Sequence, residues 1–382
     1  MKTKYLAIFL FGFFAILCCA KNNEWQGTKE TRDGVTYIRN PETGLWRDSK
    51  KLILKEVLSI GIEEGDEDYV FASIKDVEVD RSGNIYVCDF KDDCIKVYDQ
   101  TGHFLKKFGS RGSGPGELFG PWKISINQDN EIFISEAGTR RISIFTLEGI
   151  FQKSFKVPLS VFDMTCLKNG EAIVSAMIND SPFSADKNIQ NLYHIYTSTG
   201  QLISSFGKPI IQLEHVQPKQ YSVVYMNFFD NYLICIPNYP YRIEWYNEEY
   251  NLEKVVTREC TFLTAPELIM ENEYMPIYSS RGILGRIFFF PDGKFLVTLL
   301  DLGENYKDNL LSEIKKQQFN FPEEIKLYYD FYDKNGHFLQ SFSIDPNYGS
   351  IIFIDEQGFV YTKSGADEIP MLRKFEISFE DK

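Results

Sequence analysis

The stretch Val77–Phe108, VEVDRSGNIYVCDFKDDCIKVYDQTGHFLKKF, decides the fold. Moved forward by 47 residues, it lies without a gap on Ile124–Phe155, ISINQDNEIFISEAGTRRISIFTLEGIFQKSF. Each copy contains four short apolar runs separated by turns rich in Gly, Asn and Asp. The alternation of apolar and polar residues within the runs predicts antiparallel strands joined by tight turns. Four strands per unit, repeated with a period in the forties, are typical of a β-propeller blade.

Further copies follow along the chain in looser form. Their apolar runs and turns recur over residues 162–206, 226–256, 287–342 and 351–377. One four-stranded unit cannot bury both of its faces, whereas units stacked around an axis cover one another. The repeats therefore predict a ring of six blades.

The last copy contains three strands, so we expect its fourth strand at the other end of the chain. Leu52–Gly61 has the pattern of an outermost strand and precedes the first unit. Pairing with Leu372–Ile377 would leave no open seam in the ring. The predicted fold class is all-β: a six-bladed β-propeller of four-stranded antiparallel blades, closed 3+1 by an N-terminal strand.

The first residues have the features of an export signal. Lys2 and Lys4 precede Leu6–Leu17, an apolar run shorter than the roughly 20 residues that a membrane-spanning helix needs. Ile16, three positions before Cys19, resembles the aliphatic residue of a bacterial lipoprotein signal. The resemblance implies lipidation of Cys19. Lipidation of Cys18 and ordinary cleavage near Ala20 are the alternatives. We thus divide the chain into a signal peptide at 1–18, a tether and N-terminal extension at 19–50, and the propeller at 51–382.

The charge of the chain bears on its partners. Without Lys2 and Lys4 the chain carries 39 basic and 54 acidic side chains, a net charge of −15. So acidic a protein is unsuited to binding nucleic acid or an anionic membrane surface. We therefore expect no nucleic-acid partner, and membrane attachment only through the N-terminal lipid.

The first two units carry a family resemblance. Asp80–Asp89, DRSGNIYVCD, and the Gly-rich link Gly109–Pro121 resemble the blade and connector of NHL repeats, specifically over residues 74–155. With the signal sequence, six units and the closing strand, the whole chain resembles the six-bladed propeller lipoproteins common in Bacteroidetes. The resemblance implies export and a place on the cell envelope, as an outer-membrane lipoprotein. It implies no particular activity.

Two insertions interrupt the repeat. Asp308–Gln318 places Leu310, Leu311 and Ile314 at helical spacing after a candidate cap, Asp308. Thr264–Ser280 opens with Thr264 and Glu267 at the spacing of a capping box. We expect a short helix in each insertion, where it could wall a groove on one face of the ring.

Five cysteines lie outside the signal region. Cys88 and Cys94 fall on neighbouring strands of the first unit, where an exported protein could join them by a disulfide. The odd number and the strand positions of Cys166 and Cys235 favour buried thiols. No Cys-x-x-Cys pair with metal-ligand spacing occurs in the sequence.

The sequence offers little for catalysis. Some NHL-type propellers are lyases that use histidines or a metal near the axis, but the four histidines here are not spaced for one metal ion. In the acidic loop Glu63–Asp68, neither a central glycine nor a distal glutamate falls at the offset that a calcium-binding EF-hand loop requires. No Gly-x-Ser-x-Gly nucleophile motif is present. We therefore expect no cofactor, with calcium held by axial carboxylates as the alternative.

The mouth of the central channel remains as the candidate site. Residues just before or inside the inner strands should face the axis; these are Lys75, Asp76, Trp122, Lys123, Asp163, Asn227 and Arg286. Such mixed charge suits an anionic or hydroxylated ligand, although the same groups could pair with one another. The tyrosine-rich loops near 238–241 and 264–282 are a second set of candidates, because exposed aromatic rings stack on sugars or bind protein partners.

We therefore interpret the chain as an exported, lipid-anchored propeller that binds a glycan or a protein at the cell envelope. The alternative is a hydrolase or lyase working in the central channel, with or without a divalent cation. Convergence of several carboxylate oxygens at the axis would favour the enzyme. A channel plugged by apolar or mutually paired side chains would leave binding through the loops.

Overall fold

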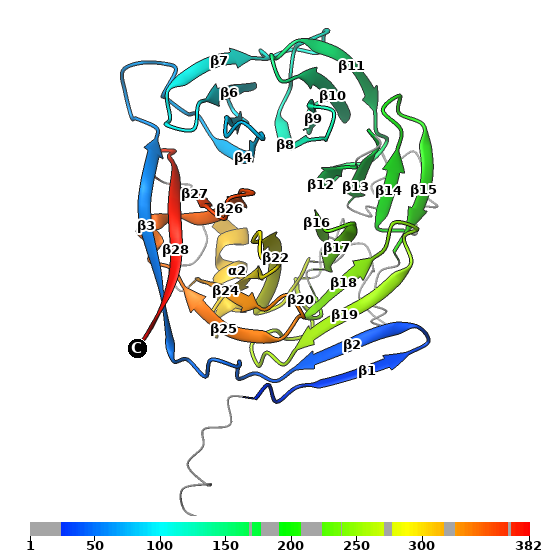
Figure 1. Ribbon diagram of the computed structural model, residues 1–382. Helices are drawn as coiled ribbons and strands as arrows, with labels where there is room; N and C mark the ends of the chain where they lie inside the picture. The colour runs from blue at the N-terminus through cyan, green and yellow to red at the C-terminus, as the bar shows by residue number, and fades with distance from the viewer. Residues whose placement is uncertain are drawn as a thin grey trace, which may run out of the picture.

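Six antiparallel sheets stand around a common axis in the computed structural model (Figure 1). The structure describes residues 24–167, 170–176, 191–207, 224–237, 239–270, 277–316, 325–365 and 368–382. The candidate signal peptide, Cys19 and the nearby Ala20 lie outside these residues. Within them, no helix is long and apolar enough to cross a membrane.

Each blade is given from its innermost strand outward. The first three are β4 (Ile74–Val79), β5 (Ile85–Asp89), β6 (Cys94–Tyr98) and β7 (Phe104–Phe108); β8 (Pro121–Ile126), β9 (Glu131–Glu136), β10 (Arg141–Thr146) and β11 (Phe151–Lys156); and β12 (Val161–Cys166), β13 (Ala172–Ala176), β14 (Tyr193–Tyr196) and β15 (Leu202–Phe206). The last three are β16 (Val224–Phe229), β17 (Tyr232–Pro237), β18 (Arg242–Tyr246) and β19 (Leu252–Arg258); β22 (Gly282–Phe289), β23 (Phe295–Asp301), β24 (Lys326–Tyr332) and β25 (Phe338–Ser343); and β26 (Ser350–Ile354), β27 (Val360–Lys363), β28 (Leu372–Asp381) and β3 (Lys50–Ile60). The predicted fold class is confirmed.

The turns between strands repeat one device. The Asp80 carboxylate accepts hydrogen bonds from the backbone N–H groups of Ser82 and Asn84, and Asp355 does the same after β26. The turn glycine adopts the left-handed conformation, with φ of 85° at Gly83. A short carboxylate that folds back onto its own backbone favours such turns. Asp and Gly therefore recur at fixed positions of the sequence repeat.

The ring closes as the repeat count predicts. Strand β3 pairs antiparallel with β28, from Ile60 opposite Leu372 to Lys50 opposite Asp381. The two strands run side by side at the edge of the ring in Figure 1. Three strands of the last blade thus come from the C-terminal end of the chain and one from the N-terminal side.

The hydrophobic core lies between the blades. Each neighbouring pair of blades shares one cluster of buried side chains, which makes six clusters among the described residues. The second strands are buried on both faces; every residue of β5 is buried, for example. Alternate side chains of such a strand enter different clusters: Ile85 and Val87 pack toward the last blade, and Tyr86 and Cys88 toward the second.

The segment predicted as a tether and extension adds to a blade. β1 (Thr28–Arg32) and β2 (Val35–Asn40) form a hairpin, and β2 pairs parallel with β19. The buried Asn40 side chain donates to the carbonyls of Thr257 and Gly336 and accepts from the N–H of Phe338. This amide therefore links the fourth and fifth blades.

One of the two helix predictions is wrong. α2 (Tyr306–Lys316) confirms a helix in the fifth blade, although it begins before Asp308, which lies in its first turn. The other insertion instead forms an antiparallel pair, β20 (Glu267–Met270) with β21 (Ile277–Ser279). Pairing between these two short runs prevails over the local capping-box signal. All five cysteines of the described residues are free thiols, so Cys88 and Cys94 are not joined.

Candidate functional site

The starts of the inner strands share an irregularity that turns side chains toward the axis. The pairing register shifts near the beginning of β4, β8, β12, β22 and β26. An extra residue at such a point re-aims the side chains beside it. Here it places Asp76, Lys123 and Asp163, from three successive blades, in mutual contact.

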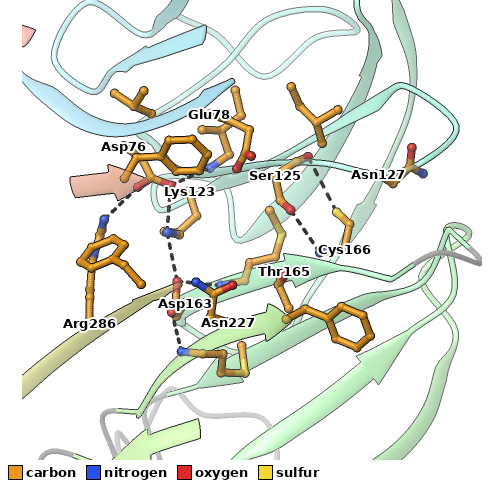
Figure 2. A pocket seen from close by; sticks show the side chains of 18 of the residues that line it. Asp76, Glu78, Lys123, Ser125, Asn127, Asp163, Thr165, Cys166, Asn227 and Arg286 are labelled. Carbon is orange, nitrogen blue, oxygen red and sulfur yellow. Dashed lines mark hydrogen bonds and ion pairs between the residues drawn. The ribbon is translucent and has the colours of Figure 1, made fainter. Parts of the chain in front are cut away.

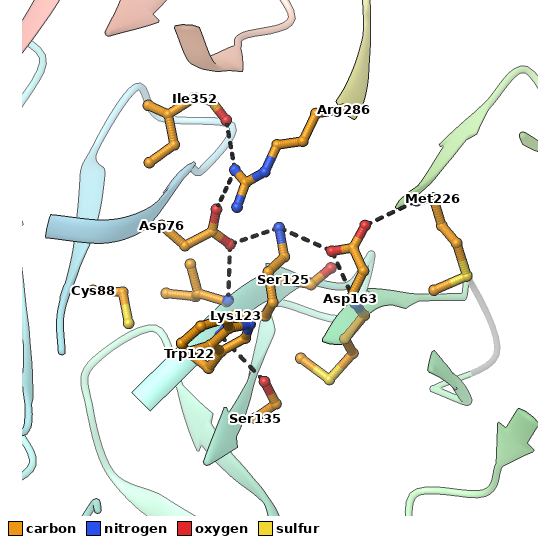
Figure 3. A network of polar contacts seen from close by, with 12 residues as sticks. Asp76, Cys88, Trp122, Lys123, Ser125, Ser135, Asp163, Met226, Arg286 and Ile352 are labelled. Carbon is orange, nitrogen blue, oxygen red and sulfur yellow. Dashed lines mark hydrogen bonds and ion pairs between the residues drawn. The ribbon is translucent and has the colours of Figure 1, made fainter. Parts of the chain in front are cut away.

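These three side chains and Arg286 form a layer of ion pairs across the channel, which we call the axial layer (Figure 3). Lys123 Nζ lies 2.9 Å from Asp76 Oδ2 and 3.2 Å from Asp163 Oδ1. Arg286 Nη1 lies 3.0 Å from Asp76 Oδ1. The amide N–H of Ile124 donates to Asp76, and that of Met226 donates to Asp163. Every charge of the layer is therefore paired.

The opposite charges of the layer stabilise the ionised forms of Asp76 and Lys123. Burial acts to raise the pKa of Asp76, but Lys123 and Arg286 outweigh it and hold the pKa below its usual value. Burial acts to lower the pKa of Lys123, but Asp163 and Asp76 outweigh it and raise the pKa. Asp76 and Lys123 therefore both remain ionised at neutral pH, so they form a salt bridge rather than share a proton.

A cavity of about 310 Å³ adjoins the layer toward the ends of the inner strands (Figure 2). Its polar wall includes Glu78, Ser125, Thr165 and Asn227, and its apolar wall includes Phe228 and Phe353. Asn227 Nδ2 donates to the carbonyl of Ile287, and Ser125 Oγ accepts from the N–H of Cys166. The cavity thus has neutral hydrogen-bonding groups around a floor of paired charges.

Glu78 is the unusual member of the wall. Burial and the neighbouring Asp76 raise the pKa of its carboxyl to about 8. The group is therefore mostly protonated at neutral pH, when it can both donate and accept a hydrogen bond.

Lys75 and Trp122 lie apart from the cavity. They precede Asp76 and Lys123 on their strands, so they occupy the mouth on the other side of the axial layer. Lys75 Nζ lies 3.3 Å from the centroid of the Trp122 ring, and Trp122 Nε1 donates to the carbonyl of Phe162 at 3.0 Å. The seven predicted residues are therefore divided between two places: five line the cavity, and two lie at this second mouth.

Of the polar wall residues named above, the sequence prediction missed Glu78, Ser125 and Thr165. Each stands two positions after an axial residue that was predicted, namely Asp76, Lys123 and Asp163. Side chains two apart on a strand point to the same face. The period-two rule, extended along the strand, would have found them.

The structure describes two rings of the first tyrosine-rich loop, and Tyr239 is half-buried. Tyr241 is buried, and its hydroxyl donates to Asp330 between the fourth and fifth blades. Residue 238 and residues 271–276 lie outside the described part of the chain. In the described ranges no group of three or more His, Cys, Asp or Glu side chains could hold a metal ion.

Comparisons with known proteins agree with the fold. A family model described as a 6-bladed beta-propeller matches residues 47–255. A member of the DUF4221 family from Bacteroides vulgatus superposes with a TM-score of 0.58 at 10% identity, covering 88% of this chain and 99% of its own. A protein from Bacteroides fragilis, whose name marks it as exported, superposes with a TM-score of 0.56 at 11% identity. This match covers 90% of this chain and 99% of that protein. No curated protein matches the sequence.

Proposed function

The chain belongs to the DUF5128 family of six-bladed β-propellers, and we propose that it is an exported binding module whose axial cavity holds a hydroxylated ligand, a sugar unit of a glycan. The apolar run before Cys19 supports export and lipid anchoring at the cell envelope, as an outer-membrane lipoprotein. The name of the similar Bacteroides fragilis protein agrees with export.

The wall of the cavity carries this proposal. Sugar hydroxyls both donate and accept hydrogen bonds, and the groups at hand do the same: the Thr165 hydroxyl, the Asn227 amide and the protonated Glu78 carboxyl. Among the described residues, neither Thr165 Oγ1 nor Asn227 Oδ1 has a hydrogen-bond partner, so both can serve a ligand. Phe228 and Phe353 supply apolar surface for the faces of a sugar ring.

The size of the cavity favours a small group over a protein surface. Its volume of about 310 Å³ is at the lower end of the range for small-molecule pockets, roughly 300–1,000 Å³. A protein ligand would have to insert a side chain. A glycan can insert one terminal sugar.

A glycan array probed with the purified full chain tests the proposal. We expect binding to a defined set of glycans, confirmed by calorimetry with the best of them. Thr165→Val and Asn227→Leu should each weaken that binding by up to about tenfold, since each removes a hydrogen bond worth roughly 0.5–1.5 kcal/mol.

The matched control is Thr31→Val, because Thr31 is exposed on the edge strand β1. It should leave the affinity unchanged. Binding to none of the glycans, or equal loss in Thr31→Val and Thr165→Val, would contradict the proposal.

One observation favours the enzyme alternative. A cavity carboxyl with a pKa near neutrality, like that of Glu78, suits a general acid in a hydrolase or lyase. Glu78→Gln distinguishes the two functions, because the amide keeps both hydrogen-bonding capacities but cannot give up a proton. A binding module would keep most of its affinity in this variant. An enzyme would keep its affinity and lose turnover of the bound glycan.

A further inference from the structure

Three basic side chains approach one another at the second mouth of the channel: Lys75, Lys363 and Arg286, which belongs to the axial layer itself. Lys75 comes from β4, Arg286 from β22 and Lys363 from β27, so three different blades contribute. Lys363 Nζ donates to the carbonyl of Ile74 at 3.2 Å. All three side chains are partly exposed, so solvent can reach them.

The carboxylates nearby do not balance this charge. Asp76 is the ion-pair partner of Arg286, and it also pairs with Lys123. Among the described residues, no carboxylate lies within ion-pair distance of Lys75 or Lys363. The Lys75 ammonium instead rests against the π face of Trp122.

The neighbouring positive charges disfavour the charged forms of the two lysines. Burial first, then Lys363 and Arg286, lower the pKa of Lys75 to about 8. Burial and Arg286 also lower the pKa of Lys363. Excess positive charge is unexpected in a chain with a net charge of −13, and a bound anion would relieve it.

We propose that Lys75 and Lys363, close to Arg286 of the axial layer, form a binding site for an oxyanion: a sulfate, phosphate or carboxylate group. The ammonium groups would donate to its oxygens as charge-assisted hydrogen bonds, which are stronger than neutral ones. Neither lysine lines the proposed sugar cavity, and Arg286 belongs to the axial layer that separates the two places. The anion can be a free ion or a group carried by a larger ligand.

Trp122 makes the site observable. The indole contacts Lys75 directly, so an anion that draws the ammonium away should change its fluorescence. We would titrate the full chain with sodium sulfate at constant ionic strength, using chloride as the reference salt, and repeat the titration with Trp122→Phe. A saturable change is expected in the native chain and none in Trp122→Phe.

Substitutions of the two lysines test whether these side chains bind the sulfate. Sulfate affinity, measured by calorimetry, should fall at least about tenfold in Lys75→Met/Lys363→Met, since two charge-assisted contacts are lost. Lys106→Met is the matched control, because Lys106 is also a half-buried lysine that donates to a backbone carbonyl, that of Leu147. Thermal melts of both variants show that they are folded.

Titration with glucuronate and with glucose separates the sources of the anion. Binding of glucuronate but not glucose at this mouth would assign a carboxylate carried by a sugar. Binding of sulfate or phosphate without glucuronate would assign a free ion. Absence of saturable binding by all three anions, or equal affinities in the native chain and the double variant, would overturn the proposal. Failure of the glycan array would not affect this result.

Discussion

The two sides of the axial layer differ in chemistry although they belong to one channel. On the cavity side, hydroxyl, amide and carboxyl groups surround about 310 Å³ of space. On the other side, Lys75 rests against Trp122, with Lys363 and Arg286 close to Lys75. The pKa of the acidic group Glu78 is raised on the first side, and that of the basic group Lys75 is lowered on the second.

The layer itself helps to explain this difference. Its charges satisfy one another, so they are not available as partners for the groups on either side. Asp76 then acts on Glu78 as a like charge, and Arg286 acts on Lys75 in the same way. Together with burial, Asp76 favours the neutral form of Glu78, and Arg286 favours the neutral form of Lys75. A self-paired network can therefore tune two sites without contacting their ligands.

Breaking the layer should have the largest effect. Lys123→Met leaves Asp76 and Asp163 buried without their shared cation, and breaking such a pair costs about 3–5 kcal/mol. We expect the free energy of unfolding, measured by urea denaturation, to fall by that amount.

The control for this variant is Lys55→Met, which removes the exposed pair with Glu376 on β3 and β28. Exposed pairs of this kind contribute about 0–1 kcal/mol. If Lys123→Met cost no more than Lys55→Met, the layer would not have the role described above.

The next effect concerns Glu78 and pH. Its pKa of about 8 in the folded state exceeds the 4.5 of an unperturbed glutamate, so unfolding releases a proton between these pH values. The stability of the native chain should therefore fall as pH rises from about 4.5 to 8, by at most about 1.4 kcal/mol per pH unit from this group. Glu78→Gln should lose this part of the slope, while Glu64→Gln, in the exposed acidic loop, should keep it. Parallel stability curves for all three chains would contradict the prediction.

A smaller effect is expected for Lys75. Its pKa of about 8 means that it loses its charge as pH rises through that value, while sulfate keeps its own. Sulfate affinity should therefore fall severalfold between pH 7 and pH 9. The groups around Lys75 that enter this titration are Lys363, Arg286, Asp76 and the Cys88 thiol. An affinity independent of pH would exclude Lys75 from the site.

The fold and the axial residues could be predicted because their signals are local and repeated. Period-two alternation recurs along the blades and Asp–Gly turns recur in several of them, and the starts of the inner strands fix Asp76, Lys123 and Asp163 at the axis. Lys363 could not be found in this way. It lies on a second strand, and it reaches the mouth only because β27 pairs with β26 beside the first blade.

The remaining differences between the sequence predictions and the structure come from pairings between distant segments. The Asp33–Gly34 turn is a hairpin signal, and both residues have positive φ, but nothing local indicates that β2 would pair parallel with β19. Likewise, Thr264 and Glu267 have helix-cap spacing, whereas β20 pairs antiparallel with β21. Local sequence patterns do not show which distant segments will pair as strands.

The most direct test of two separate sites in one channel is a crossed binding measurement by calorimetry. The best glycan from the array and sodium sulfate are each titrated into Thr165→Val/Asn227→Leu and into Lys75→Met/Lys363→Met. The account predicts that the first variant loses affinity for the glycan alone and the second for sulfate alone. If each variant lost affinity for both ligands, or if both variants kept their affinity for both ligands, the axial layer would not divide the channel into two sites.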